Sequence, residues 1–254
     1  MTGRKIFIIL VSLLAVAGVM QTAALAAPEI PIPRIGLEMQ PAETPQDVAL
    51  SLQILFLLTV LSLAPAILIM TTSFTRIIIV LSFIRNALAT QQTPPNQVLI
   101  GLALFLTLFV MSPVISDINE QAFRPYMEER IDFTEAIERA MQPLRTFMLR
   151  QTRQKDLALF VDLSGGEGVE DVNGVQNRAL IPAFIISELK TAFQMGFLLF
   201  VPFLVIDMVV ASTLMSMGMM MLPPIMVSLP FKILLFIMVD GWNLIVQSLV
   251  TGFR

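Results

Sequence analysis

The residues best able to do chemistry in this sequence are ionisable side chains within strongly apolar segments. They are Glu188, Lys190, Asp207, Lys232 and Asp240. A charge at the centre of a lipid-exposed helix costs about 2.5 to 3.5 kcal/mol or more, so we do not expect these side chains to face lipid. Two of the carboxylates, Asp207 and Asp240, could relay protons or ions. Alternatively, the five residues form structural polar contacts with one another or with a partner subunit, or line a channel without coupling.

Other routes to catalysis are excluded or disfavoured by the residue types. The chain has no Cys and no His, which removes thiolate and imidazole nucleophiles, Cys or His metal ligands and disulfides. An intramembrane aspartyl protease would need a GxGD pattern, whereas Asp240 precedes Gly241-Trp242. The glycines of residues 164–174 lack the spacing of a phosphate-binding loop. We therefore predict no enzyme activity, no cofactor and no metal.

The composition indicates that the elements holding these residues lie in a membrane. Of the 254 residues, 56% are hydrophobic and 14% are charged, and the mean hydropathy is +0.81. These values lie outside the usual range of a soluble domain. The sixteen Lys and Arg residues are scattered and the net charge is −3, so the chain lacks the basic surface that binds nucleic acid. The sequence predicts an integral membrane protein without a nucleic-acid partner.

The N-terminal residues have the features of a cleavable signal peptide. Arg4 and Lys5 precede an apolar run at 6–20, and Ala24-Leu25-Ala26 is an A-x-A cleavage site. We predict a signal peptide over residues 1–26. The alternative, a retained membrane helix, is disfavoured because the run is shorter than the roughly 20 residues that a span needs. The Pro-rich residues 27–47 then form an extended tether.

Four later segments are apolar and long enough to cross a membrane. They cover residues 48–72, 98–116, 195–217 and 222–250. Internal prolines should kink or break these helices, and the freed backbone groups then need protein or water as partners. We predict an all-α membrane protein with two hydrophobic hairpin regions, 48–116 and 179–254, whose broken helices are buried in an oligomer.

One hydrophilic region, residues 117–178, separates the two hairpin regions. It holds twelve of the nineteen acids and eight of the sixteen bases. Apolar residues at helical spacing predict two amphipathic helices that separate near Pro143. The short connection after the first span carries Arg76 and Arg85 and no acid, as is typical of a cytoplasmic side. We therefore expect the acidic region and the mature N-terminus to lie outside.

A methionine-rich run lies between the last two apolar segments. Residues 215–221 read MSMGMMM, and Pro223 and Pro224 follow shortly after. Methionine has a flexible side chain and a polarisable sulfur, so it adapts to irregular shapes, and such a run most often packs in a core. We expect Gly218 to supply backbone freedom and the two prolines to stiffen the exit from the turn.

Two segments resemble the signature segments of a known family. PAFIISELKTAFQMGF at 182–197 and PFKILLFIMVDGW at 230–242 are closely similar to those of the FliP family, the export-gate components of flagellar type III secretion. The order of a signal peptide, two spans, an acidic outer region and two further spans also resembles that family. The resemblance covers essentially the whole mature chain, and the leader favours the flagellar branch over the injectisome branch.

This resemblance implies a specific assembly. Five copies of the chain would form a ring that, with FliQ and FliR, makes the export gate of the flagellar basal body in the bacterial inner membrane. Unfolded flagellar subunits would pass through its pore, and the hairpins would be lifted largely out of the bilayer. The resemblance also implies that Met219, Met220 and Met221 form a gasket that blocks ions while admitting a polypeptide.

The resemblance further implies roles for the polar residues. Glu188 and Lys232 lie in the matched segments and are expected to contact other subunits, and Arg153 is expected to line or brace the pore. We group Asp207 and Asp240 with them as inter-subunit polar contacts. Two other functions stay open, an ion-coupled transporter that uses Asp207 and Asp240, and a structural scaffold of the basal body.

Overall fold

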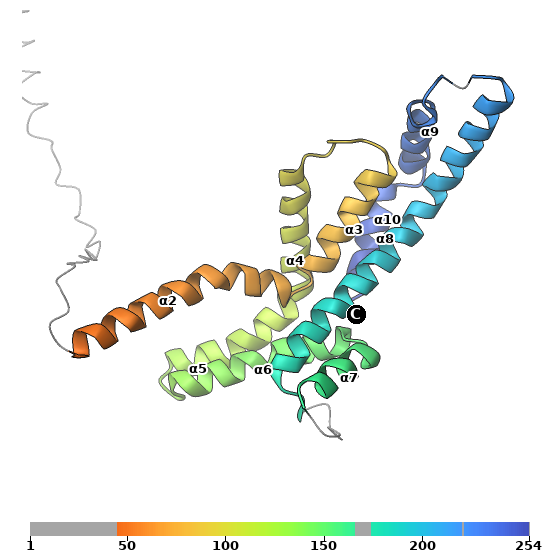
Figure 1. Ribbon diagram of the computed structural model, residues 1–254. Helices are drawn as coiled ribbons and strands as arrows, with labels where there is room; N and C mark the ends of the chain where they lie inside the picture. The colour runs from red at the N-terminus through yellow and green to blue at the C-terminus, as the bar shows by residue number, and fades with distance from the viewer. Residues whose placement is uncertain (1–44, 166–173, 220, 254) are drawn as a thin grey trace, which may run out of the picture. The chain divides into compact units, whose positions relative to one another are not determined.

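The computed structural model describes residues 45–165, 174–219 and 221–253, and every regular element within them is helical (Figure 1). The predicted all-α fold is therefore confirmed for these residues. The signal peptide at 1–26 and the tether up to residue 44 lie outside the described residues. Contacts within the chain divide it after Gln53, and the unit from Ile54 onward contains the features considered below. The elements are α2 (Pro45–Met70), α3 (Phe74–Ala87), α4 (Asn96–Ile118), the π-helical turn η1 (Asn119–Phe123), α5 (Arg124–Met127), α6 (Phe133–Gln151), α7 (Gln154–Leu163), α8 (Asn177–Ser216), α9 (Pro224–Met238) and α10 (Gly241–Thr251).

Among the described residues, three helices are long and apolar enough to cross a membrane, and a bent pair supplies a fourth candidate. The three cover Ser51–Met70, Asn96–Met127 and Asn177–Ser216. The pair is α9 and α10, which meet at an angle of 63° across a short break. The four apolar segments predicted from the sequence are thus helical. The third begins earlier than expected because α8 continues for 40 residues through both Pro182 and Pro202.

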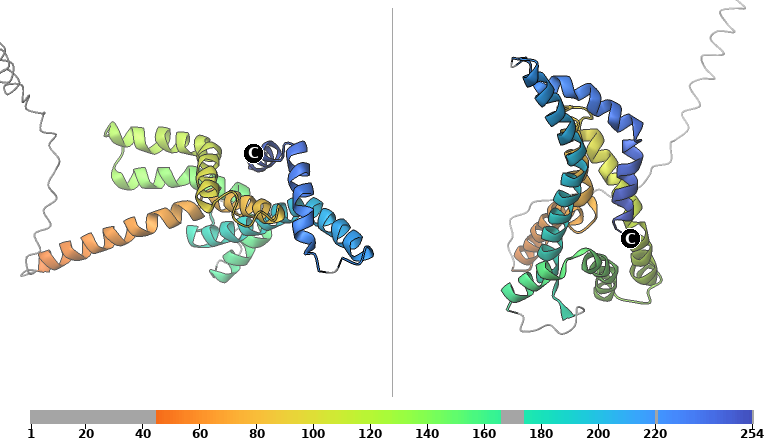
Figure 2. Two further views of the ribbon diagram at one scale, coloured as in Figure 1. Left: turned by 90° about the horizontal axis from the view of Figure 1, so that it is seen from above. Right: turned by 90° about the vertical axis from the view of Figure 1, so that its right-hand side faces the viewer.

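Helix α3 is the centre of the larger hydrophobic core. Its buried residues recur every three or four positions, so they form one continuous face of the helix. Helix α3 packs against α8, which runs beside it (Figures 1 and 2). It also contacts α4. Ile245 and Leu249 of α10 and Phe236 of α9 complete the same core. This packing fixes the last two helices against the first hairpin.

A second core joins the hydrophilic region to the start of α8. Phe147 and Met148 of α6 pack with Leu180 and Phe184 of α8. The predicted pair of amphipathic helices is present, but their separation near Pro143 was wrong, because α6 runs through Pro143 to Gln151. The chain turns instead at Thr152 and Arg153, where the Arg153 backbone N–H donates to Ser187 Oγ at 2.9 Å. A contact from α8 therefore fixes the corner that the proline was expected to make.

Candidate functional site

The methionine-rich turn begins with a well-formed helix end. Gly218 has a φ of 76°, in the left-handed region that favours glycine. Its N–H donates to the Met215 carbonyl and the Met219 N–H donates to the Leu214 carbonyl, both at 3.0 Å. These two bonds make a Schellman motif, in which a left-handed residue ends the helix and satisfies its last carbonyls. No atom of the described residues lies within 4 Å of a Cβ built on Gly218, so backbone conformation rather than crowding selects the glycine.

The turn ends at two prolines and presents its methionines outward. Pro223 is extended and precedes α9, and Pro224 occupies the first turn of α9, where a missing N–H is tolerated. Between these ends, the exposed fraction is 42% for Met219 and 99% for Met221, whereas Met220 lies outside the described residues. Met215 and Met217 are also exposed. The run is therefore not core packing within one copy of the chain.

Arg76 and Glu188 form a buried ion pair between α3 and α8. The Arg76 Nε donates to Glu188 Oε2 at 2.9 Å, and Nη2 donates to the other carboxylate oxygen. The same guanidinium donates to the carbonyl of Gly252 and to Gln151 Oε1, each at 3.0 Å. It also lies 3.9 Å from the ring centre of Phe253, a cation–π distance. Arg76 thus connects α3, α6, α8 and the C-terminal residues.

Lys232 and Asp207 form a second polar cluster, farther along α8. Lys232 is 2% exposed, and its Nζ donates to Asp207 Oδ2 at 2.6 Å and to the Ala87 carbonyl at 3.1 Å. The Ser228 hydroxyl donates to the other Asp207 oxygen at 2.6 Å. The cluster ties α9 to α8 and to the end of α3. Because a buried ammonium group needs charged or polar partners, these contacts account for its tolerance in an apolar helix.

A third group of contacts holds α7 against α8. Lys190 of α8 donates to Asp156 of α7, whose side chain is almost fully buried. The Arg153 guanidinium donates to Thr191 Oγ1 at 3.2 Å and to Gln194 Oε1. Arg153 therefore braces the α6–α7 corner onto α8 within the same chain. Whether it also lines a pore stays a prediction.

Asp240 differs from the other predicted polar residues. It lies in the break between α9 and α10, is exposed and has a φ of 49°. Its carboxylate accepts a hydrogen bond from Asn243 Nδ2 at 3.2 Å. The predicted polar residues, all of which the structure describes, are thus distributed over several places, and among them only Asp207 and Lys232 contact each other directly. Their expected contacts with other subunits stay predictions.

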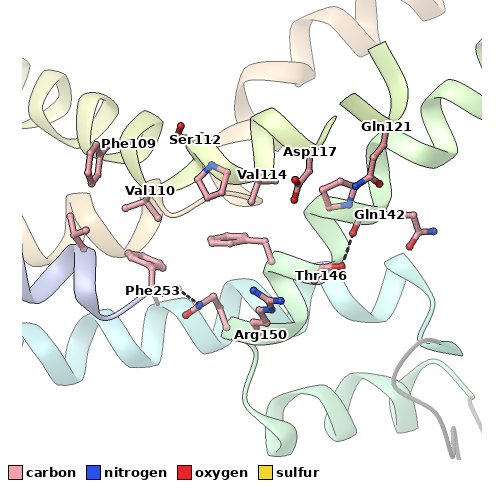
Figure 3. A pocket seen from close by; sticks show the side chains of 15 residues that line it. Phe109, Val110, Ser112, Val114, Asp117, Gln121, Gln142, Thr146, Arg150 and Phe253 are labelled. Carbon is pink, nitrogen blue, oxygen red and sulfur yellow. Dashed lines mark hydrogen bonds between the residues drawn. The ribbon is translucent and has the colours of Figure 1, made fainter. Parts of the chain in front are cut away.

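A cavity of about 620 Å³ lies between α4, α6 and the C-terminal residues (Figure 3). Its lining combines the aromatic rings of Phe109, Phe147 and Phe253 with the polar side chains of Asp117 and Arg150. None of the methionines and charged residues predicted as site residues is among the described residues that line this cavity. Within the described ranges, no group of three or more Asp and Glu side chains is placed to hold a metal ion.

The contacts that the sequence did not predict join residues far apart in the chain. Arg76 and Glu188 are 112 positions apart, and Lys190 and Asp156 are 34 apart. Local spacing carries no signal for such pairs. The sequence indicates only that such partners exist, because a charge in an apolar helix requires one, and it does not indicate which residue the partner is.

Comparisons with known proteins identify relatives of this chain. The FliP family model matches residues 57–249. The flagellar biosynthetic protein FliP of Bacillus subtilis (strain 168) is 59% identical over 209 residues, covering 82% of this chain and 95% of that protein. The FliP of Pectobacterium carotovorum subsp. carotovorum is 57% identical over 208 residues, covering 82% of this chain and 81% of that protein. The FliP of Borreliella burgdorferi (strain ATCC 35210 / DSM 4680 / CIP 102532 / B31) is 51% identical over 210 residues, covering 82% of this chain and 83% of that protein.

Proposed function

Since the chain belongs to the FliP family and is a component of the flagellar export apparatus, we propose that it forms the export pore of that apparatus. Copies of the chain assemble into a five-membered ring with FliQ and FliR, and unfolded flagellar subunits cross the inner membrane through it. After signal cleavage, the N-terminus lies outside. The chain conducts substrate and carries no catalytic residue of its own.

The methionine-rich turn carries this proposal. Gly218 ends α8 and Pro224 begins α9 within a few residues, so the turn is short and its ends are fixed. Met221 is almost fully exposed, which is unfavourable for an apolar side chain unless another molecule covers it. In a ring, the turns of neighbouring copies would meet. Flexible thioether side chains could then close on one another and still repack around a passing polypeptide.

The apolar helices support assembly with other chains. The most apolar stretch of each of the three long helices has few buried residues. No residue of this stretch is buried in Ser51–Met70, whereas 22% are buried in Asn96–Met127 and 11% in Asn177–Ser216. Lipid or other subunits must cover surfaces of this size, because monomeric proteins rarely expose large apolar patches to water. Ring neighbours and the FliQ and FliR subunits would provide such cover.

The gasket role is tested by replacing Met219, Met220 and Met221 together with Ser-Gly-Ser, which keeps the length of the turn. We expect cells with this variant to leak small ions, measured as a loss of membrane potential, while export continues in part. The matched control replaces Met215 and Met217 with Leu, and it should leave the potential unchanged. A variant complex that assembles at normal levels without any leak would refute the gasket.

A further inference from the structure

The ionisable residues of the apolar regions are not all paired within one chain. Residues 54–116 and 179–253 contain seven of them. Three bases each contact one acid, namely Arg76 with Glu188, Lys190 with Asp156 and Lys232 with Asp207. The remaining two, Arg85 and Asp240, form no ion pair with any described residue. One is a cation and the other an anion.

Arg85 lies at the end of α3 with only neutral partners among the residues described. Its Nη1 donates to Asn96 Oδ1 and, at 3.5 Å, to the Pro94 carbonyl. Its Nε is buried and has no hydrogen-bond partner in the described part of the chain. Because this Nε is enclosed, a partner from another molecule can reach only the terminal nitrogens of the guanidinium, of which Nη2 makes no hydrogen bond to a described residue and stays available to an anion.

Asp240 lies in the break between α9 and α10, and its carboxylate forms no ion pair with a described residue. Among the described residues, the one hydrogen-bond donor to its carboxylate is the neutral Asn243 amide. Aspartate tolerates the left-handed backbone of this position and suits the N-terminus of α10. Asparagine would meet the backbone requirement equally well, so the left-handed conformation does not by itself require a charge, and the helix N-terminus stabilises a carboxylate only modestly.

We propose that Arg85 of each copy forms an ion pair with Asp240 of the neighbouring copy in the ring. Arg85 contacts the start of α4, and Asp240 follows the end of α9. Figure 1 shows α4 on one side of α3 and α9 on the other side. Two different residues on different sides of a protomer make a head-to-tail contact, which is the type that closes into a ring. A lipid phosphate could pair with Arg85 but would leave Asp240 unpaired. A second copy of this chain satisfies both charges at once. This inference rests on the proposed ring.

Cysteine cross-linking tests the contact directly, because the natural chain has no Cys. Two chains with different tags are co-expressed with the other export components, one carrying Arg85→Cys and the other Asp240→Cys. A short bifunctional maleimide spans the length of the replaced arginine side chain, which a direct disulfide cannot, and with it we expect a covalently linked dimer that carries both tags. Either variant expressed alone should give no linked dimer. Only contact between copies can join the tags, so an intramolecular bond cannot imitate the result.

Charge exchange supplies a second readout. Arg85→Glu and Asp240→Lys should each lower the yield of oligomer at least about tenfold, and the double variant should restore most of it. Asp240→Asn keeps the backbone preference and removes the charge, so it should lower the yield in the same way, whereas a purely structural Asp240 would tolerate it. Native mass spectrometry of the unsubstituted complex separates the two proposals. A chain that stays monomeric with its partners contradicts the ring, whereas an intact ring without the doubly tagged dimer contradicts only this pair.

Discussion

At the scale of single residues, each buried charge of the apolar helices has its counter-charge on another helix. Glu188 of α8 is completely buried against Arg76 of α3. Removing one partner of a buried pair leaves the other without compensation, which costs about 3 to 5 kcal/mol. The pairs therefore define which helices pack together, because a wrong pairing would strand a charge in an apolar core.

The Arg76–Glu188 pair can be tested by comparing the loss of one partner with the loss of both. Glu188→Gln should lower the free energy of unfolding by about 3 kcal/mol, because Arg76 stays buried without a carboxylate. Replacing both, as Arg76→Met with Glu188→Leu, should cost less than the sum of the two single changes. Thermal unfolding of the purified protein in detergent measures each variant. Additive losses would show that the two side chains act independently.

A substitution of Asp207 distinguishes a structural role of this residue from a role in ion coupling. Asp207→Asn keeps an acceptor for Ser228 but leaves the buried Lys232 without a negative partner. We expect less assembled complex, with a loss of about 3 kcal/mol in stability, and partial recovery when Lys232→Met is added. The amount of complex in detergent extracts measures this. Full assembly with abolished export would instead favour the ion-coupled transporter.

At the scale of secondary-structure elements, the contact between α3 and α8 depends on a glycine. A Cβ built on Gly196 would lie 2.5 Å from Phe83 Cγ, so the ring as a whole would have to move. The Phe83 ring is itself held edge-on against Phe193 at a centroid distance of 5.3 Å. Small residues of this kind let membrane helices approach closely.

Gly196→Ala and Gly101→Ala form a matched pair for this contact. Both glycines lie inside helices, where alanine is favoured by about 1 kcal/mol, but Gly101 has no atom within 4 Å of an added Cβ. We expect Gly101→Ala to be neutral or stabilising. Gly196→Ala should be less stable than Gly101→Ala by about 1 to 3 kcal/mol because of overpacking. Equal melting temperatures for the two variants would show that Phe83 relaxes freely.

The elements themselves were largely predictable from the sequence, whereas their junctions were not. Long apolar runs predicted the membrane helices because length and composition are local properties. The end of α6 was misplaced because Pro143 suggests a break, while the actual turn depends on Ser187, 34 positions beyond Arg153. In the same way, the methionine-rich turn is visible in the sequence as a motif, but its hydrogen bonds to α8 and the exposure of its side chains depend on the three-dimensional arrangement. Partners that are distant in sequence leave no local pattern.

At the scale of the whole molecule, the apolar surface exceeds what one chain can bury. Phe105 of α4 is 74% exposed and Leu198 of α8 is 70% exposed, although both helices also supply core residues. In a lone chain, lipid or detergent has to cover these faces. In the proposed ring, the faces of adjacent copies would cover one another. A face covered by another subunit stays inaccessible to a reagent after the complex is extracted into detergent, whereas a face covered by lipid becomes accessible.

Single cysteines report this difference because the chain has none of its own. Phe105→Cys and Leu198→Cys should react with a small maleimide in the chain purified alone in detergent, and should be protected at least about tenfold in the assembled complex, because packed interfaces exclude reagents that detergent admits. Lys155→Cys, exposed at the start of α7, serves as the control and should react in both states. Equal reaction of all three positions in the complex would mean that α4 and α8 present these faces to lipid, and that subunit contacts in the ring use other surfaces.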